Sequence, residues 1–138
     1  MSFTLDRRLE GDSLYVTNLR LCNVRLMNNK RFPWLILVPM REGASEWIDL
    51  SREDQHQLSD EIAIVSHLFQ ALVTPDKLNI AALGNQVPQL HIHLIARYKG
   101  DKAWPNPVWG ADSEEYSEEE SRRFIYDLKT AIDSVQAA

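Results

Sequence analysis

The sequence is poor in cysteine, in basic residues and in long apolar runs. With Cys22 as the only cysteine among 138 residues, neither an intrachain disulfide nor a cysteine-based zinc site can form. This use of cysteine is typical of a reducing cytoplasm. The net charge of -5 supplies no broad basic surface for a nucleic-acid backbone. We therefore expect a cytoplasmic protein that does not bind nucleic acid.

Membrane insertion and export are not expected either. Residues 1–8 carry charges with no apolar run behind them, and the longest apolar stretch, Trp34 to Met40, is far shorter than a bilayer span. The 44% of apolar residues is enough for one packed core, and no repeat or Gly/Ser-rich linker divides the chain. The sequence predicts a single domain over residues 1–138.

Apolar and alternating segments predict five short strands. They are expected at Leu14–Val16, Cys22–Met27, Trp34–Val38, Leu78–Leu83 and Leu90–Tyr98. The third is apolar on both faces, which is typical of a central, buried strand. The last two are separated by the turn Gly84–Pro88 and are expected to pair as a hairpin.

Two helices are predicted from cap signals and apolar stripes. Ser51, with Asp54 three residues on, begins the first helix, and Pro75 ends it. Its stripe is Leu58, Ile62, Val65, Phe69 and Leu72. Ser117 and Glu120 form a capping box for the second, whose stripe is Phe124, Leu128, Ile132 and Val135. The fold class is α+β: an antiparallel meander of about five strands, with one helix across a face and another at the C-terminus.

Histidines 91 and 93 are the residues most suited to chemistry. Side chains alternate faces along a strand, so Leu90, Ile92, Leu94 and Ala96 form a core face under the helices. His91 and His93 then share the opposite face, close enough to hold one phosphate group together. Two other interpretations stay open: the histidines are polar residues on a solvated face, or they are two metal ligands. The metal interpretation lacks a third ligand nearby.

The segment Gln86–Arg97 resembles the signature of the histidine-triad family, in which three histidines alternate with apolar residues. More loosely, Phe32–Pro39 is similar to an earlier strand of that family, so the resemblance spans roughly residues 14–102. The remainder, 103–138, is the C-terminal loop and helix. The resemblance implies an enzyme that cleaves the α-phosphate of a nucleotide conjugate through a nucleotidyl-histidine intermediate, without a metal or other cofactor. It also implies a homodimer that extends the sheet.

By this resemblance His91 is the nucleophile and His93 holds phosphate oxygens and assists the leaving group. Gln86 matches a glutamine that contacts the phosphate or the leaving group, while Asn28 and Asn79 lie where polar contacts to ribose and phosphate are usual. Imidazole suits this chemistry, because much of it is uncharged and nucleophilic at neutral pH. A protonated His93 could stabilise the charge on phosphate.

The chain departs from the family pattern at two positions. The first triad histidine is Gln89, which can hydrogen-bond but carries no positive charge, and a further family histidine aligns with Trp34. Trp34 is either a core residue or part of the phosphate pocket. These departures keep a second hypothesis open, a nucleotide-binding module with weak or no turnover. The stiff loop Ala103–Gly110, which contains Trp104 and Trp109, is expected to pack rather than to close over the site.

Overall fold

The computed structural model describes residues 3–136 and contains one five-stranded antiparallel sheet. Its strands are β1 (Ser13–Asn18), β2 (Cys22–Met27), β3 (Trp34–Pro39), β4 (Lys77–Ala81) and β5 (Ile92–Arg97). They lie in the order β1-β2-β3-β5-β4, so β3 is central and every one of its residues is buried. The predicted α+β class, strand number and central strand are confirmed.

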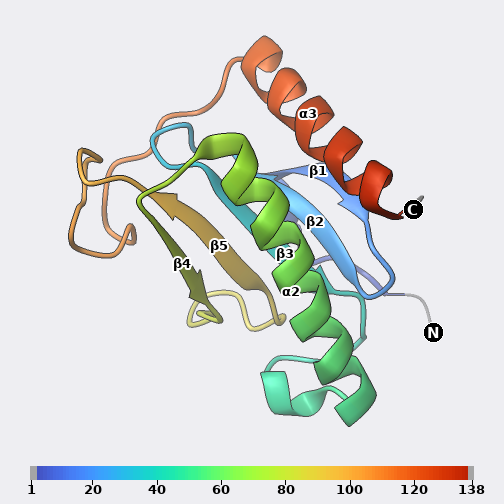
Figure 1. Cartoon of the computed structure of the whole chain (residues 1–138). Helices are drawn as coiled ribbons and strands as arrows, with labels where there is room; N and C mark the ends of the chain where they lie inside the picture. Colours follow the sequence, from blue (N-terminus) through green and yellow to red (C-terminus); the bar gives the residue numbers. More distant parts are fainter. Residues whose placement is uncertain (1–2, 137–138) are drawn as a thin grey trace.

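Two long helices cover one face of this sheet (Figure 1). They are α2 (Arg52–Val73) and α3 (Glu118–Gln136). The Ser51 hydroxyl accepts a hydrogen bond from the Asp54 backbone N–H, and Ser117 and Glu120 form the reciprocal capping box. Both predicted helix starts are thus confirmed. Leu72 and Val135, the last members of the two predicted stripes, are instead partly exposed, at 38% and 44%.

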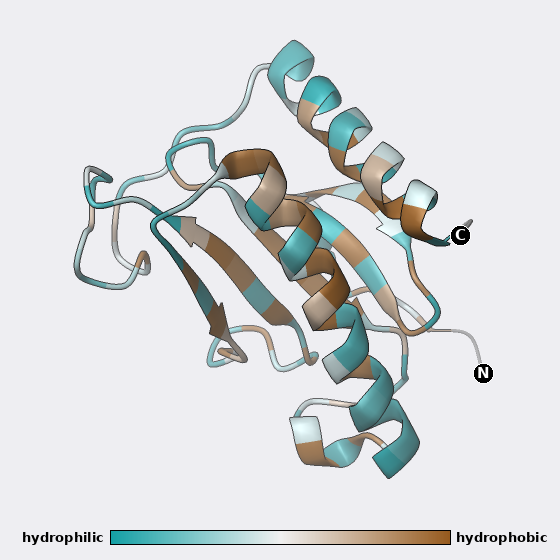
Figure 2. Cartoon of the chain, in the orientation of Figure 1, coloured by the Kyte–Doolittle hydropathy of each residue, from teal (hydrophilic) through white to brown (hydrophobic). Residues whose placement is uncertain are grey.

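The sheet separates two apolar clusters. Side chains alternate along β5, where Leu94 and Ala96 face the helices and Ile95 faces away from them. The central strands are mostly hydrophobic, while the helices carry both kinds of residue (Figure 2). The second cluster is covered by residues 3–12, which include the short helix α1 (Arg7–Asp12), and by the loop after β5.

Two short helices were not predicted from the sequence: α1 and the 3-10 helix η1 (Trp47–Asp49). The loop between β4 and β5 also differs from the prediction. The strands pair as an antiparallel hairpin, but the ladder stops at Ala81 and His93, so residues 82–91 form a long loop. His91 therefore lies just before the strand and not within it. No helix among residues 3–136 is long and apolar enough to cross a membrane.

Candidate functional site

His91 and His93 lie together on the sheet face that turns away from α2 and α3. Their ring centroids are 4.8 Å apart with the ring planes at 73°. Both side chains belong to residues that are only about one-twentieth exposed, at 5% and 4%. The two imidazoles thus share one surface, as the alternation of faces predicted.

The backbone fixes the tautomer of the neutral His91 ring. Its Nδ1 lies 2.7 Å from the carbonyl oxygen of Gln89. A carbonyl oxygen can only accept, so Nδ1 carries the hydrogen and donates it. The other nitrogen, Nε2, keeps its lone pair in the uncharged ring. This tautomer presents a nucleophilic nitrogen away from the backbone.

His93 has both ring nitrogens engaged. The indole N–H of Trp34 donates to Nδ1 at 3.0 Å, and Nε2 lies 3.2 Å from the carbonyl oxygen of Leu83. An indole N–H can only donate, so His93 is the neutral tautomer with its hydrogen on Nε2. Burial, and then the neighbouring His91, lower the pKa of His93 to about 4. His93 is uncharged at neutral pH, so a protonated His93, considered from the sequence as a possible stabiliser of charge on phosphate, is not the form present there.

The low pKa of His93 predicts an acid-sensitive fold. In the unfolded chain its pKa returns to about 6.5, so the unfolded state binds the extra proton first as the pH falls. The free energy of unfolding should drop between pH 6.5 and the folded pKa of about 4, by about 3 kcal/mol in total. Urea denaturation at several pH values measures this drop. His93→Gln should flatten it, whereas a His56→Gln control, at an exposed position on α2, should not.

His91 borders two cavities. The larger has a volume of about 410 Å³ and also reaches His93. Its apolar lining is Leu9, Met27, Trp34, Ile36, Leu83, Val87 and Trp109, and its polar lining is Asp12, Asn85, Gln86 and the two histidines. This volume and mixture are typical of small-molecule sites.

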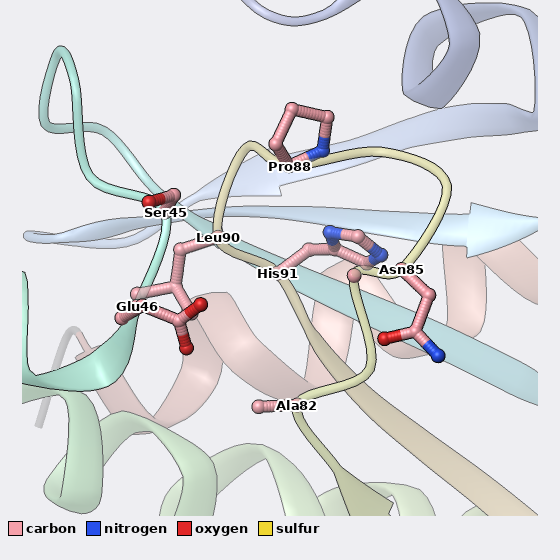
Figure 3. A pocket seen from close by; sticks show the side chains of 8 residues that line it. Ser45, Glu46, Ala82, Asn85, Pro88, Leu90 and His91 are labelled. Carbon is pink, nitrogen blue, oxygen red and sulfur yellow. The ribbon is translucent and has the colours of Figure 1, made fainter.

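The second cavity lies on another side of His91 and has a volume of about 200 Å³. Figure 3 shows Glu46 on one side of it, Asn85 on the other and the His91 ring above them. Gly84 also lines it, and a β-carbon there would lie 2.7 Å from the carbonyl oxygen of Val87. The loop can bring residue 84 this close to the Val87 carbonyl only because residue 84 is glycine.

Three aromatic rings form one wall of the larger cavity. Trp109 lies edge-on to His93 and Trp34, with centroid distances of 5.1 Å and 5.8 Å. Trp34 is both a buried residue, at 6% exposure, and a lining residue of this cavity, while its part in a phosphate pocket stays a prediction. In the loop after β5, Trp104 packs over the Arg97 guanidinium of the same chain, while Trp109 borders the cavity. Trp109 was not among the predicted site residues.

The other predicted residues lie at different distances from this cavity. Gln86 borders it. Asn28 lines a neighbouring cavity of about 580 Å³, with its amide bonded to Glu115 and to the backbone N–H of Tyr116. Asn79 accepts a hydrogen bond from Arg97 on the adjacent strand.

The Gln89 side chain does not line this cavity. It forms hydrogen bonds with backbone groups of the N-terminal segment instead. The structure therefore brings together His91, His93 and Gln86, and it places Asn28, Asn79 and Gln89 in hydrogen bonds within the protein. Within residues 3–136, no three His, Cys, Asp or Glu side chains lie together as a possible metal site.

Comparison with known proteins identifies the relatives of this chain. The family model described as "HIT domain" matches residues 8–100. No protein among the curated ones matches.

Solved structures of three bacterial histidine triad proteins are similar to almost the whole chain. The protein from Bradyrhizobium japonicum is 44% identical with a TM-score of 0.93, and the match covers 96% of this chain and 99% of that one. The protein from Sinorhizobium meliloti is 46% identical with a TM-score of 0.91, covering 94% and 96%. The protein from Marinobacter aquaeolei is 42% identical with a TM-score of 0.93, covering 97% and 98%.

Proposed function

The chain belongs to the histidine-triad (HIT) family, and we propose that it is a nucleotide phosphate hydrolase or transferase. The proposed reaction cleaves a nucleotide conjugate at its α-phosphate through a nucleotidyl-histidine on His91. One observation carries the proposal. The Gln89 carbonyl holds the hydrogen of His91 on Nδ1, which leaves the lone pair of the neutral ring on Nε2, and His91 borders a cavity of about 410 Å³.

In the first step the Nε2 lone pair attacks the α-phosphorus. The bond from phosphorus to the leaving group breaks, and the leaving group takes the electron pair. The ring now carries a positive charge, which the Nδ1–H···O=C bond to Gln89 stabilises. In the second step water attacks phosphorus, the P–N bond breaks with its electrons returning to Nε2, and the proton of water passes to solvent. Another acceptor in place of water gives transfer.

We propose that His93 positions the site and is not its general acid. A second proton on His93 would have to enter at Nδ1, which accepts the Trp34 N–H, and the low pKa opposes it. Suitable leaving groups are those that depart as stable anions or that take a proton from water. Dinucleoside polyphosphates and nucleoside phosphoramidates both meet this condition.

The cavity lining fits the rest of a nucleotide. The Trp34 and Trp109 rings offer apolar surface to a nucleobase. The amide groups of Gln86 and Asn85 lie on the same cavity and supply hydrogen-bond donors for phosphate oxygens.

A second candidate function is a nucleotide-binding module with weak or no turnover. The observation in its favour is the lack of positive charge on the two residues best placed to supply it. His93 is neutral at neutral pH and the Gln89 amide is engaged elsewhere, so neither offers a cation to the charge that develops on phosphate.

We also propose that the protein forms a homodimer that extends the sheet, and that it lies in the cytoplasm. β4 is an edge strand, and Ile80 on it is 52% exposed on the side of the sheet that faces α2. Ile64 and Leu72 of α2 are also exposed. An unpaired strand edge beside apolar side chains is suited to pairing with a second copy. The one cysteine, Cys22, is free and buried, which fits a reducing compartment.

Mass spectrometry of the intact protein tests the main proposal. The protein is mixed with adenosine phosphoramidate or with a dinucleoside polyphosphate, quenched, and analysed for AMP release and for an adduct on His91. Release with an adduct at His91 supports the covalent mechanism. AMP binding without release favours the binding module, and an adduct on a different residue contradicts the assignment of the nucleophile.

A further inference from the structure

Residues 3–12, which we call the N-terminal arm, form part of the cavity. Phe3, Leu5 and Leu9 of the arm pack in the apolar cluster on the sheet face opposite α2. Leu9 and Asp12 border the 410 Å³ cavity itself. The arm passes behind the sheet in the view of Figure 1, on the side where the histidines lie. A displaced arm would remove one side of the proposed nucleotide pocket.

The side chain of Gln89 holds this arm with two hydrogen bonds. Its Oε1 accepts from the backbone N–H of Asp6 at 2.8 Å, and its Nε2 donates to the backbone carbonyl of Thr4 at 2.9 Å. The residue thereby joins two chain segments more than 80 positions apart. The carbonyl of the same Gln89 fixes the His91 tautomer. One residue therefore connects the arm to the proposed nucleophile.

An amide suits this task better than the imidazole of the family pattern. The oxygen and nitrogen of a primary amide point out on the same side, so they can pair with a C=O and an N–H two residues apart on one chain. The two nitrogens of an imidazole point in strongly diverging directions. Glutamine at position 89 can thus make both bonds at once, whereas histidine can make one.

Contacts of Arg8 form a second attachment between the arm and loop 82–91. The Arg8 guanidinium donates to the backbone carbonyl of Gln86 at 2.8 Å and pairs with the carboxylate of Asp6. Asp6 also caps α1 by accepting a hydrogen bond from the Arg8 backbone N–H. Arm and loop 82–91 therefore meet at two points, Gln89 and Gln86, both in the loop segment that leads to His91.

We propose that Gln89 is a positioning residue that clasps the N-terminal arm and so completes the nucleotide pocket. The clasp itself is independent of the proposed function, while its effect on ligands rests on that function.

Hydrogen–deuterium exchange of the full-length Gln89→Ala variant tests the clasp. The loss of two hydrogen bonds should speed exchange of arm amides, including that of Asp6, by about tenfold. In the same variant the KM for the conjugate, or the Kd for AMP, should rise several-fold with a smaller change in kcat, because the arm lines the pocket and does not touch the reacting atoms. Gln89→His, which can keep one of the two bonds, should give arm exchange between that of the wild type and that of Gln89→Ala.

Gln55→Ala is the matched control, since the Gln55 side chain also donates to a backbone carbonyl, that of Leu50, at the start of α2. It should leave arm exchange and AMP affinity unchanged. Unchanged arm exchange in Gln89→Ala overturns the clasp, and faster exchange with unchanged affinity overturns the role of the arm in the pocket. If wild-type protein binds no AMP, the proposed function fails, and the exchange result still decides the clasp.

Discussion

Replacing His91 with alanine is expected to reduce turnover by a factor on the order of 10³ or more, because the covalent intermediate can no longer form. The change removes the hydrogen bond from Nδ1 to the Gln89 carbonyl, and His91 lies outside the β5 ladder. The free energy of unfolding should therefore change by no more than about 1–2 kcal/mol. Steady-state kinetics with circular dichroism and urea denaturation measure both effects.

Two controls test whether the loss of turnover is specific to the His91 imidazole. His56→Ala removes an exposed histidine of α2 and should leave the rate unchanged. Added imidazole should restore part of the activity of His91→Ala, because it can enter the vacated space and attack phosphorus in place of the missing ring. A His91→Ala variant with wild-type turnover would show that the reaction proceeds without this histidine.

Local patterns in the sequence were sufficient to predict the main elements of the fold. The apolar run Trp34–Val38 predicted the central strand, and two Ser-based cap signals predicted the starts of α2 and α3. The alternation in β5 also predicted which side chains face the helices. These features depend on neighbours in sequence, which is why they are readable from one chain. The short helix α1 was missed because six residues carry too little periodicity.

The candidate site was predictable only in part, because its hydrogen bonds join distant segments. The pairing of His91 with His93 follows from strand alternation. The engagement of Gln89 with Thr4 and Asp6 does not, since more than 80 residues separate the partners. The charge of His93 could not be predicted either, because it depends on burial and on the Trp34 N–H, neither of which a single sequence specifies.

Replacing Asp101 with alanine is expected to destabilise the fold strongly. The Asp101 carboxylate and the Arg97 guanidinium form a buried pair, with side chains only 5% and 2% exposed. The carboxylate also accepts hydrogen bonds from the backbone N–H groups of Tyr98, Ala103 and Trp104. Removing it leaves a buried, unpaired guanidinium, which costs about 3–5 kcal/mol. Urea denaturation of the variant measures the loss.

The double variant Arg97→Met, Asp101→Leu distinguishes the cost of a buried unpaired charge from the loss of side-chain packing. Replacing both charges should recover part of the stability lost in Asp101→Ala, because no charge is then left unpaired. Equal stability of Asp101→Ala and wild type would show that the pair contributes nothing.

Asp101 and His93 affect the free energy of unfolding in different pH ranges. The hydrogen bond from Arg97, and then those from the backbone, hold the pKa of Asp101 well below its usual value. A carboxylate with a lowered pKa stabilises the fold above the unfolded pKa of about 4, and this contribution is lost only as the pH falls further. The contribution of His93 to the free energy of unfolding is lost between about pH 6.5 and pH 4. Stability should therefore fall in two stages, and Asp101→Asn should reduce the lower stage, to which other carboxylates with a lowered pKa also contribute, while leaving the upper one in place.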